Sequence, residues 1–248
     1  MEDELVSIIT PTYNCAKFIG RTIDSVLKQT YTNWEMIIVD DASKDNTEEI
    51  VLNYKDPRIK YIKLEKNAGP ANARNKSMQE AKGKYIAFLD SDDIWMPEKL
   101  EKQIKFMKVN GYNMTATSYE HINEQDEKLN KIVKCKEKVD YNGMLLSCPV
   151  GNSTVMYNVG MLGKFEVPDI KKRNDYALWL KMLKKEKYVY GLDDVLMEYR
   201  IREKSVSSNK FALVKYHWYL YRKIEHLSII RSAFHVCYFA IMKIFKLK

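Results

Sequence analysis

The chain has 248 residues, 46% of them apolar and 30% charged, and a formal net charge of +8 at pH 7. This length and apolar content suit one large folded domain, or one and a half, and they exclude a disordered chain. Residues 1–4 lack the features of a signal peptide, and no run approaches the roughly 18 apolar residues of a membrane span, so a cytoplasmic location is expected. The four cysteines show no C-x-x-C spacing, which argues against a zinc site and a disulfide framework.

Strand-like and helix-like segments alternate along the first 90 residues. Apolar runs typical of buried strands cover residues 5–10, 34–39, 59–63 and 85–89. Helical patterns cover the stretches between them, at 19–27, 46–54 and 71–81. This alternation predicts an α/β fold with a mostly parallel central sheet and helices on both faces. Ligands bind such sheets beyond the carboxyl ends of the strands.

The pattern is less regular after residue 96. A helix is expected at 97–110, and a strand at 114–119 leads into a charged, hairpin-like stretch at 120–138. Further segments follow as a strand at 152–157, a helix at 175–184, a strand at 195–199 and helices from residue 209. No internal repeat or low-complexity linker separates these parts, so one domain with a helical tail is expected.

Three closely spaced carboxylates, Asp90, Asp92 and Asp93, follow the strand at 85–89. Carboxylate oxygens are the ligands that Mg²⁺ and Mn²⁺ prefer, and such cations commonly bridge to substrate phosphates. Taken alone, the cluster is also compatible with a solvated turn or a helix cap.

Four segments in order, at 6–14, 39–43, 67–75 and 88–93, closely resemble the family 2 glycosyltransferases, which have the GT-A fold. The resemblance is strong over residues 5–110 and weaker through 175–207. It implies a metal-dependent enzyme that moves a hexose or N-acetylhexosamine from a UDP-sugar to a saccharide hydroxyl, with inversion. Residues 1–208 would form the catalytic domain, with a nucleotide-sugar half at about 1–110 and an acceptor half at about 111–208.

The resemblance also implies which residues hold the donor. Thr10, Pro11 and Tyr13 would line the nucleoside pocket, and Asp41 would accept a hydrogen bond from uracil or ribose. Arg74, in the first turn of its helix, would reach the diphosphate. The alternative for residues 40–43 is an ordinary turn that caps the next helix.

Within the acidic cluster, the family pattern makes Asp92 the metal ligand and Asp93 a second one, with Mn²⁺ or Mg²⁺ as the ion. Asp90 would contact ribose or sugar hydroxyls. Asp175 would be the catalytic base, although the Glu that commonly precedes it is replaced by Asn174. The alternative role for Asp175 is the N-cap of its helix.

The tail at 209–248 differs in charge from the rest of the chain. The last 45 residues hold nine basic side chains and one acidic one, which leaves 32 of each in the remainder. In a helix at 228–248 the following polar residues share one arc, opposite a wide apolar face: Ser228, Arg231, Ser232, His235, Lys243 and Lys246. This pattern favours a helix lying on the cytoplasmic face of the plasma membrane, and hence a lipid-linked acceptor of bacterial surface-polysaccharide synthesis. The alternatives are docking on the protein's own body or on a second copy in a homodimer.

Other functions have less support in the sequence. A non-catalytic scaffold with a membrane- or partner-binding tail would not need Asp92 and Asp175. A nucleotidyltransferase would show a Gly-rich basic loop after the first strand, and a dinucleotide-binding oxidoreductase would show G-x-G-x-x-G, and neither motif is present. The basic residues lie in an apolar amphipathic segment, so nucleic acid is not an expected partner. The basic residues Arg202 and Lys204 are assigned no role.

Overall fold

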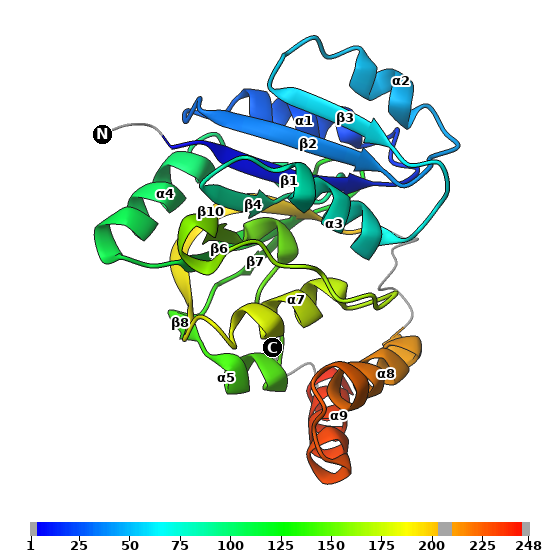
Figure 1. Ribbon diagram of the computed structural model, residues 1–248, viewed down its shortest axis with the longest axis vertical. Helices are drawn as coiled ribbons and strands as arrows, with labels where there is room; N and C mark the ends of the chain where they lie inside the picture. The colour runs from blue at the N-terminus through cyan, green and yellow to red at the C-terminus, as the bar shows by residue number, and fades with distance from the viewer. Residues whose placement is uncertain (1–3, 203–209, 245–248) are drawn as a thin grey trace.

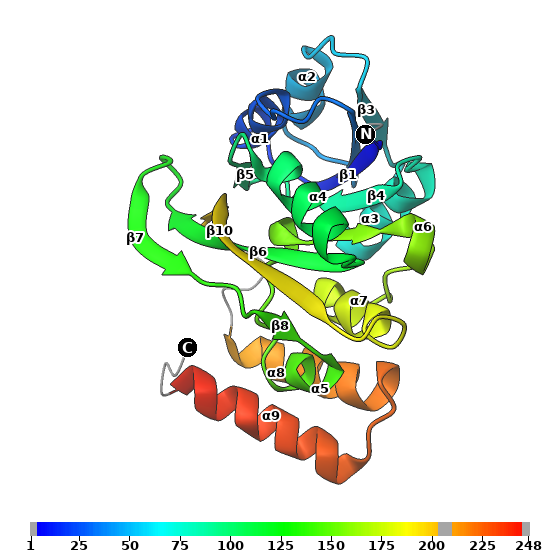
Figure 2. The ribbon, with the colours of Figure 1, turned by 90° about the vertical axis from the view of Figure 1, so that its left-hand side faces the viewer.

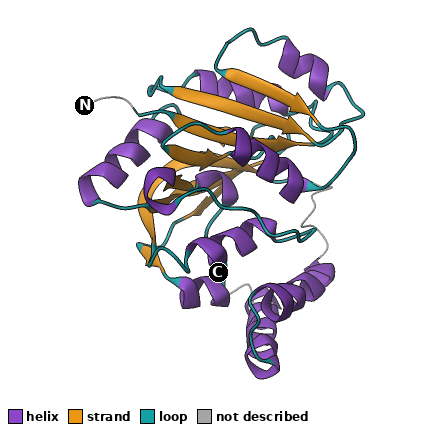
Figure 3. Ribbon diagram, viewed as in Figure 1, coloured by secondary structure: helices purple, strands orange, loops and turns teal. Residues whose placement is uncertain are grey.

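The computed structural model describes residues 4–202 and 210–244. They form one ten-stranded sheet with helices on both faces and a pair of tail helices at one end (Figure 1, Figure 3). The predicted boundary between catalytic domain and tail, at residue 208, lies outside the described residues, as does Lys204.

The first half of the chain forms the parallel part of the sheet. Its strands are β1 (Val6–Thr12), β2 (Trp34–Asp40), β3 (Ile59–Lys63) and β4 (Tyr85–Phe88). Its helices are α1 (Ile19–Leu27), α2 (Thr47–Leu52) and α3 (Pro70–Glu80). β1 lies between β2 and β4, and β3 flanks β2, with every pairing parallel. The carboxyl ends of these strands therefore meet at one edge, as the sequence predicts.

The second half extends the sheet beyond β4, with strands that run in both orientations. Its strands are β5 (Ile94–Trp95), β6 (Met114–Ile122), β7 (Lys128–Val133), β8 (Lys138–Val139), β9 (Met156–Asn158) and β10 (Val189–Arg200). Its helices are α4 (Lys99–Asn110), α5 (Tyr141–Leu146), the 3₁₀ turn η1 (Asn152–Thr154), α6 (Val159–Leu162) and α7 (Asn174–Met182). β6 and β7 pair as the expected charged hairpin.

Six strands, β1 to β4, β6 and β10, point the same way, while β5, β7, β8 and β9 point the opposite way. The strand order is β3-β2-β1-β4-β9-β6-β10-β5, so antiparallel β9 joins the two halves. The predicted mostly parallel sheet is confirmed.

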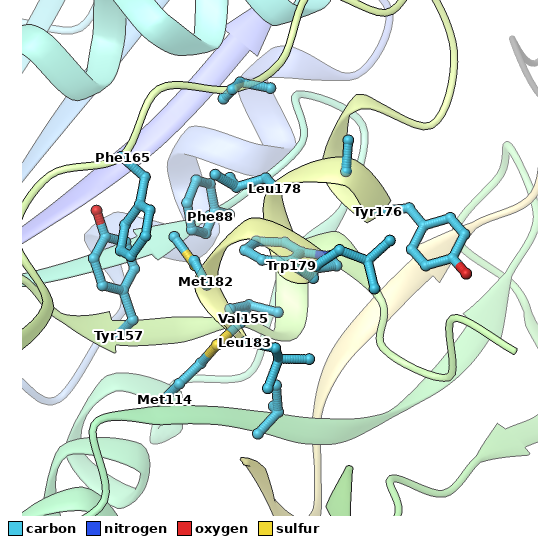
Figure 4. Packing of buried hydrophobic residues seen from close by; sticks show 14 of the residues in the cluster. Phe88, Met114, Val155, Tyr157, Phe165, Tyr176, Leu178, Trp179, Met182 and Leu183 are labelled. Atoms are coloured by element: carbon cyan, nitrogen blue, oxygen red, sulfur yellow. The ribbon is translucent and has the colours of Figure 1, made fainter. Parts of the chain in front are cut away.

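Both faces of the sheet are covered by apolar packing, which explains the unbroken apolar runs in the strands. Ile37 of β2 faces the layer of α3 and α7, and its neighbour Ile38 faces the layer of α1 and α4. Figure 4 shows Trp179 of α7 at the centre of the first layer. Its ring meets Phe88 edge-on, with 5.0 Å between the ring centroids. This packing places the start of α7 near the carboxyl end of β4.

The segment at 152–157 differs from the expected strand. It begins as the 3₁₀ turn η1 and becomes β9 only at Met156. Asn152 Nδ2 donates to Asp90 at 2.8 Å, and Ser153 Oγ donates to Asp93 at 2.5 Å. These bonds to residues about 60 positions earlier turn the segment toward the acidic loop.

The tail consists of α8 (Lys210–Tyr219), the π-helical turn η2 (Leu220–Ile224) and α9 (Ile229–Ile244). It lies at the end of the long axis opposite α2 and β3 (Figure 1, Figure 2). Glu225 ties it to the body by an ion pair with Lys184 at 2.7 Å and a hydrogen bond from the Tyr141 hydroxyl at 2.5 Å. Among the described residues, none of the helices combines the length and apolar character needed to cross a bilayer.

The orientation of α9 was not evident from its amphipathic pattern. Ser232 and His235, two members of the predicted polar arc, are buried against the protein. The opposite side exposes large apolar side chains, of which Ile230 is 82% exposed. The exposed apolar set on the tail is Trp218, Tyr219, Ile229, Ile230, Phe234 and Ile241, called the tail apolar face below.

Candidate active site

The end of β1 lies at the edge of the sheet where the carboxyl ends of the parallel strands meet, called the carboxyl edge below. Thr10 is completely buried inside the strand, and its Oγ1 has no hydrogen-bond partner among the described residues. Pro11 is partly exposed, and Tyr13, just past the strand, is 44% exposed. Tyr13 and Pro11 therefore offer surface to a ligand, whereas Thr10 is buried within the strand.

The neighbouring strand end holds two buried carboxylates. Asp40 accepts hydrogen bonds from Ser43 and from the Tyr61 hydroxyl, the latter at 2.6 Å. Asp41 accepts from the backbone amides of Ala68 and Gly69, at 2.6 and 2.8 Å. In this structure Asp41 thus holds the loop that leads into α3.

Arg74 connects three segments that are distant in sequence. It projects from the first turns of α3, is buried, and its Nη2 pairs with Asp90 at 3.0 Å. Its Nη1 donates to the side-chain oxygen of Asn174, the first residue of α7. Asn174, which stands where the family commonly has Glu, therefore accepts a hydrogen bond from Arg74 but does not neutralise its positive charge.

The three carboxylates of the acidic loop occupy different environments. Asp93 is buried, and its two oxygens accept from Ser153 Oγ at 2.5 Å and from the Arg200 amide at 3.1 Å. Asp92 is partly exposed and pairs with Arg202 at 2.9 Å. Asp90 is also partly exposed and lies between Arg74 and Asn152.

Burial and neighbouring charges shift the protonation of Asp90 and Asp93. The loss of hydration around Asp90, together with the charges of Asp92 and Asp175, raises its pKa to about 6 against the lowering effect of Arg74. Burial, with the charges of Asp92 and Asp90, holds the pKa of Asp93 well above its usual range. Asp175 on α7 is therefore close enough to act electrostatically on the acidic loop.

Asp175 is the second residue of α7, and Arg173 rather than Asp175 occupies the N-cap. The structure records no hydrogen bond or ion pair for the Asp175 carboxylate within the described residues. Because its carboxylate has no structural partner in the described part of the chain and lies near Arg74 and the acidic loop, Asp175 is available to accept a proton from a bound ligand.

No group of three or more acidic, histidine or cysteine side chains among the described residues is arranged to hold a metal ion. Magnesium-type ions are commonly held by one or two carboxylates with substrate phosphates supplying further oxygens. Asp92 fits that role because its carboxylate is reachable, whereas both oxygens of Asp93 are bonded internally.

Two features of the site are not assigned a role from the sequence. The η1 residues Asn152 and Ser153 support the acidic loop, but their segment has the composition of a strand. Arg200 and Arg202, at and just after the end of β10, stack over the Phe18 ring, and the Arg200 Nε donates to the Asp92 carbonyl at 2.8 Å. Arg200 lies in the segment through residue 207 that resembles the family only weakly, and Arg202 is assigned no role from the sequence because basic residues in loops are usually solvated.

A mixed sheet with an acidic loop and a free carboxylate at its carboxyl edge is the arrangement expected of a GT-A glycosyltransferase. The model of the family described as Glycosyl transferase family 2 matches residues 7–165. The chain therefore belongs to glycosyl transferase family 2, as its sequence motifs indicate.

Similar proteins support this assignment. TuaG of Bacillus subtilis (strain 168), a glycosyltransferase named for teichuronic acid biosynthesis, is 42% identical over 92% of this chain and 91% of its own length. The Escherichia coli UDP-Glc:alpha-D-GlcNAc-diphosphoundecaprenol beta-1,3-glucosyltransferase WfgD is 43% identical over 88% of this chain and 85% of its own. The crystal structure of S. aureus TarS 1–349 in complex with UDP-GlcNAc has a TM-score of 0.74 and 25% identity, and covers 88% of this chain and 65% of that one.

Proposed function

We propose that this glycosyltransferase moves a hexose or N-acetylhexosamine from a UDP-sugar to a hydroxyl of a lipid-linked saccharide in cell-surface polysaccharide synthesis. The observation that carries the proposal is Arg74, which bonds to both Asp90 and Asn174 and so holds the helix of Asp175 against the acidic loop. The names of WfgD and TuaG supply the classes of donor, acceptor and pathway.

Asp175 is the base in this proposal. An acceptor hydroxyl must lose its proton as its oxygen attacks the anomeric carbon, and a free carboxylate at hydrogen-bonding distance can take it. One in-line displacement inverts the anomeric centre, so an α-linked sugar nucleotide gives a β-linked product. Asp90 is assigned to donor hydroxyls, and Pro11 and Tyr13 to the nucleoside, with the Tyr13 ring available for stacking on the base.

The donor diphosphate is assigned to the space beside Asp92 and Arg74. A divalent cation, Mn²⁺ or Mg²⁺, held by Asp92 and the diphosphate would neutralise the charge of the departing UDP. Arg74 has a buried Nε without a partner among the described residues, which leaves it donor capacity toward an anion. Asp41 positions the loop before α3, and Asp93 is assigned a supporting role.

The tail is assigned to a membrane surface, where the lipid-linked acceptor would be found. The exposed residues Ile230 and Phe234 on α9 would lie among acyl chains, and Arg231 and Lys223 are exposed for anionic headgroups. The reaction would then occur on the body next to this surface.

Release of UDP from a panel of UDP-sugars, with Mn²⁺ or Mg²⁺ and a lipid-linked acceptor, tests the proposal. Metal-dependent turnover of one donor by the wild type, lost in Asp92→Ala, is the expected result. Donor binding without turnover on any lipid-linked acceptor would contradict it and favour the non-catalytic scaffold.

A further inference from the structure

A pocket lies between the N-terminus of α7, the segment after α5 and the tail helices. Its volume is about 60 Å³, and it opens to solvent. The residues lining it are Leu146, Ser147, Cys148, Arg173, Tyr176, His217, Tyr221, Phe239 and Met242. None of these is acidic, so the positive charge of Arg173 is not balanced within the pocket wall.

Arg173 has an unusual backbone and an unusual side-chain environment. Its φ of 68° and ψ of 23° are left-handed values that a residue with a Cβ adopts at a cost. Its guanidinium lies over the Phe239 ring, 5.5 Å from the centroid, and its Nε is buried without a hydrogen-bond partner. The described structure records no ion pair for Arg173. Strained residues of this kind concentrate at functional sites, where a ligand interaction can compensate for the strain.

The pocket is lined by residues of the tail and by Arg173 and Tyr176, which flank the base in sequence. Arg173 precedes Asp175 by two residues, so their Cα atoms are at most about 7.6 Å apart. Phe239 and Met242 reach the pocket from α9, the helix that carries Ile230 and Phe234 of the tail apolar face on its outer side. An anionic group beside Arg173 would thus have the reacting hydroxyl on one side and an apolar helix on the other.

We propose that this pocket binds the phosphate that joins the acceptor saccharide to its lipid carrier, with Arg173 as the phosphate-binding residue. Arg173 pairs with a phosphate oxygen through its free N–H groups, as guanidinium groups do. The first apolar units of the carrier pack on Phe239 and Met242. This assignment rests on the proposed function, and it explains how a transferase distinguishes a lipid-linked saccharide from a free one.

The test compares two acceptors that carry the same saccharide. One is linked through diphosphate to a short polyprenyl chain, and the other is an alkyl glycoside without phosphate. Arg173→Asn removes the charge and retains a residue that tolerates the left-handed backbone. Arg173→Lys keeps the charge, and Lys171→Asn removes an exposed neighbouring charge as the matched control.

Arg173→Asn is expected to raise the KM for the diphosphate acceptor at least tenfold, leaving kcat, the KM for the alkyl glycoside and the affinity for UDP unchanged. Arg173→Lys should recover most of the loss, and Lys171→Asn should behave as the wild type. An equal rise in KM for both acceptors would overturn the assignment, because Arg173 would then only position α7. Weaker flotation with anionic vesicles at unchanged acceptor KM would also overturn it, in favour of a phospholipid headgroup.

The two proposals fail in different ways. If the wild type transfers sugar to neither acceptor, the proposed function is wrong, and the pocket assignment with it. If the wild type transfers sugar to both and Arg173→Asn does not change their KM ratio, the pocket assignment alone is wrong.

Discussion

Asp92 differs from the other carboxylates of the acidic loop because a cation can displace its ion-pair partner, Arg202. Both carboxylate oxygens of Asp93 are bonded internally, to Ser153 and the Arg200 amide, and Asp90 pairs with the buried Arg74. The Arg202 guanidinium that pairs with Asp92 is itself partly exposed, at the last described residue before 203–209. A cation that binds Asp92 therefore competes with Arg202 for the same carboxylate.

Replacing Arg202 by Met should strengthen the binding of Mn²⁺ alone. The pair is partly exposed, so its loss is worth up to about 1 kcal/mol, or a two- to fivefold tighter apparent Kd. Electron paramagnetic resonance of free Mn²⁺ during titration measures this. Lys17→Met, which removes an exposed ion pair with Glu124 beside the same Phe18 ring, is the control. Unchanged or weaker binding in Arg202→Met would contradict the competition.

Ser153 supports the acidic loop through three contacts. Its hydroxyl donates to Asp93 and accepts from the Asp90 amide at 3.0 Å, and its carbonyl accepts from the Trp95 indole at 2.8 Å. Ser153→Ala leaves the buried Asp93 with one partner fewer, so urea unfolding should show a loss of about 2 kcal/mol. The loss should be smaller when Asp93 is already Asn, and full additivity of the two substitutions would contradict the assigned bond.

At the scale of elements, local patterns predicted most of the sheet. The strand at 59–63 and the helix at 71–81 lie within a residue of β3 and α3, because apolar runs and the Gly69-Pro70 start signal are local features. The turn at 152–154 was missed because its conformation depends on bonds to Asp90 and Asp93, far away in the sequence. For the same reason, the support that this turn gives to the acidic loop could not be predicted from the sequence. The carboxyl-edge location of the acidic loop, by contrast, followed from the strand pattern alone.

Lys99, the first residue of α4, is fully buried beneath the sheet and bonds to Gln103 at 2.7 Å. Burial lowers the pKa of its ammonium group to about 7. The unfolded chain then binds one proton more than the fold between about pH 7 and the usual lysine value, so this group's contribution to stability rises with pH over that interval.

Lys99→Met should remove that dependence. Relative to the wild type, the variant should gain more stability at pH 6 than at pH 9, by about 2 kcal/mol. Free energies of unfolding in urea at the two pH values measure the difference. Parallel stability curves for both proteins would show that the lysine titrates normally in the fold.

At the scale of the whole molecule, donor binding and membrane binding are assigned to different parts of the protein. Tyr13 and Asp92 lie in loops at the edge of the sheet, while the helices that carry the tail apolar face lie beyond α5 and α7 (Figure 2). The sequence predicted an amphipathic tail, but periodicity cannot show which side packs inward. The burial of Ser232 and His235 leaves the apolar side outward, toward the predicted membrane.

Ile230→Glu combined with Phe234→Glu should weaken flotation with anionic vesicles at least tenfold, because two exposed apolar side chains lose their burial in lipid. The affinity for UDP should not change, since both residues lie in the tail. Ala233→Glu, on the same exposed part of α9, adds charge with little loss of apolar surface and serves as the comparison. Monomeric protein that fails to bind vesicles before any substitution would contradict the membrane assignment, and a dimer that loses its association in the double variant would favour the homodimer.

The most direct test of the account compares acceptor-dependent UDP release by the wild type and by Asp175→Asn, with the affinity for the donor measured in parallel. The account predicts that Asp175→Asn lowers kcat by about 10²- to 10⁴-fold while the donor Kd stays within a few-fold of the wild type. Transfer at nearly the wild-type rate by Asp175→Asn would show that Asp175 is not the base and would contradict the central claim.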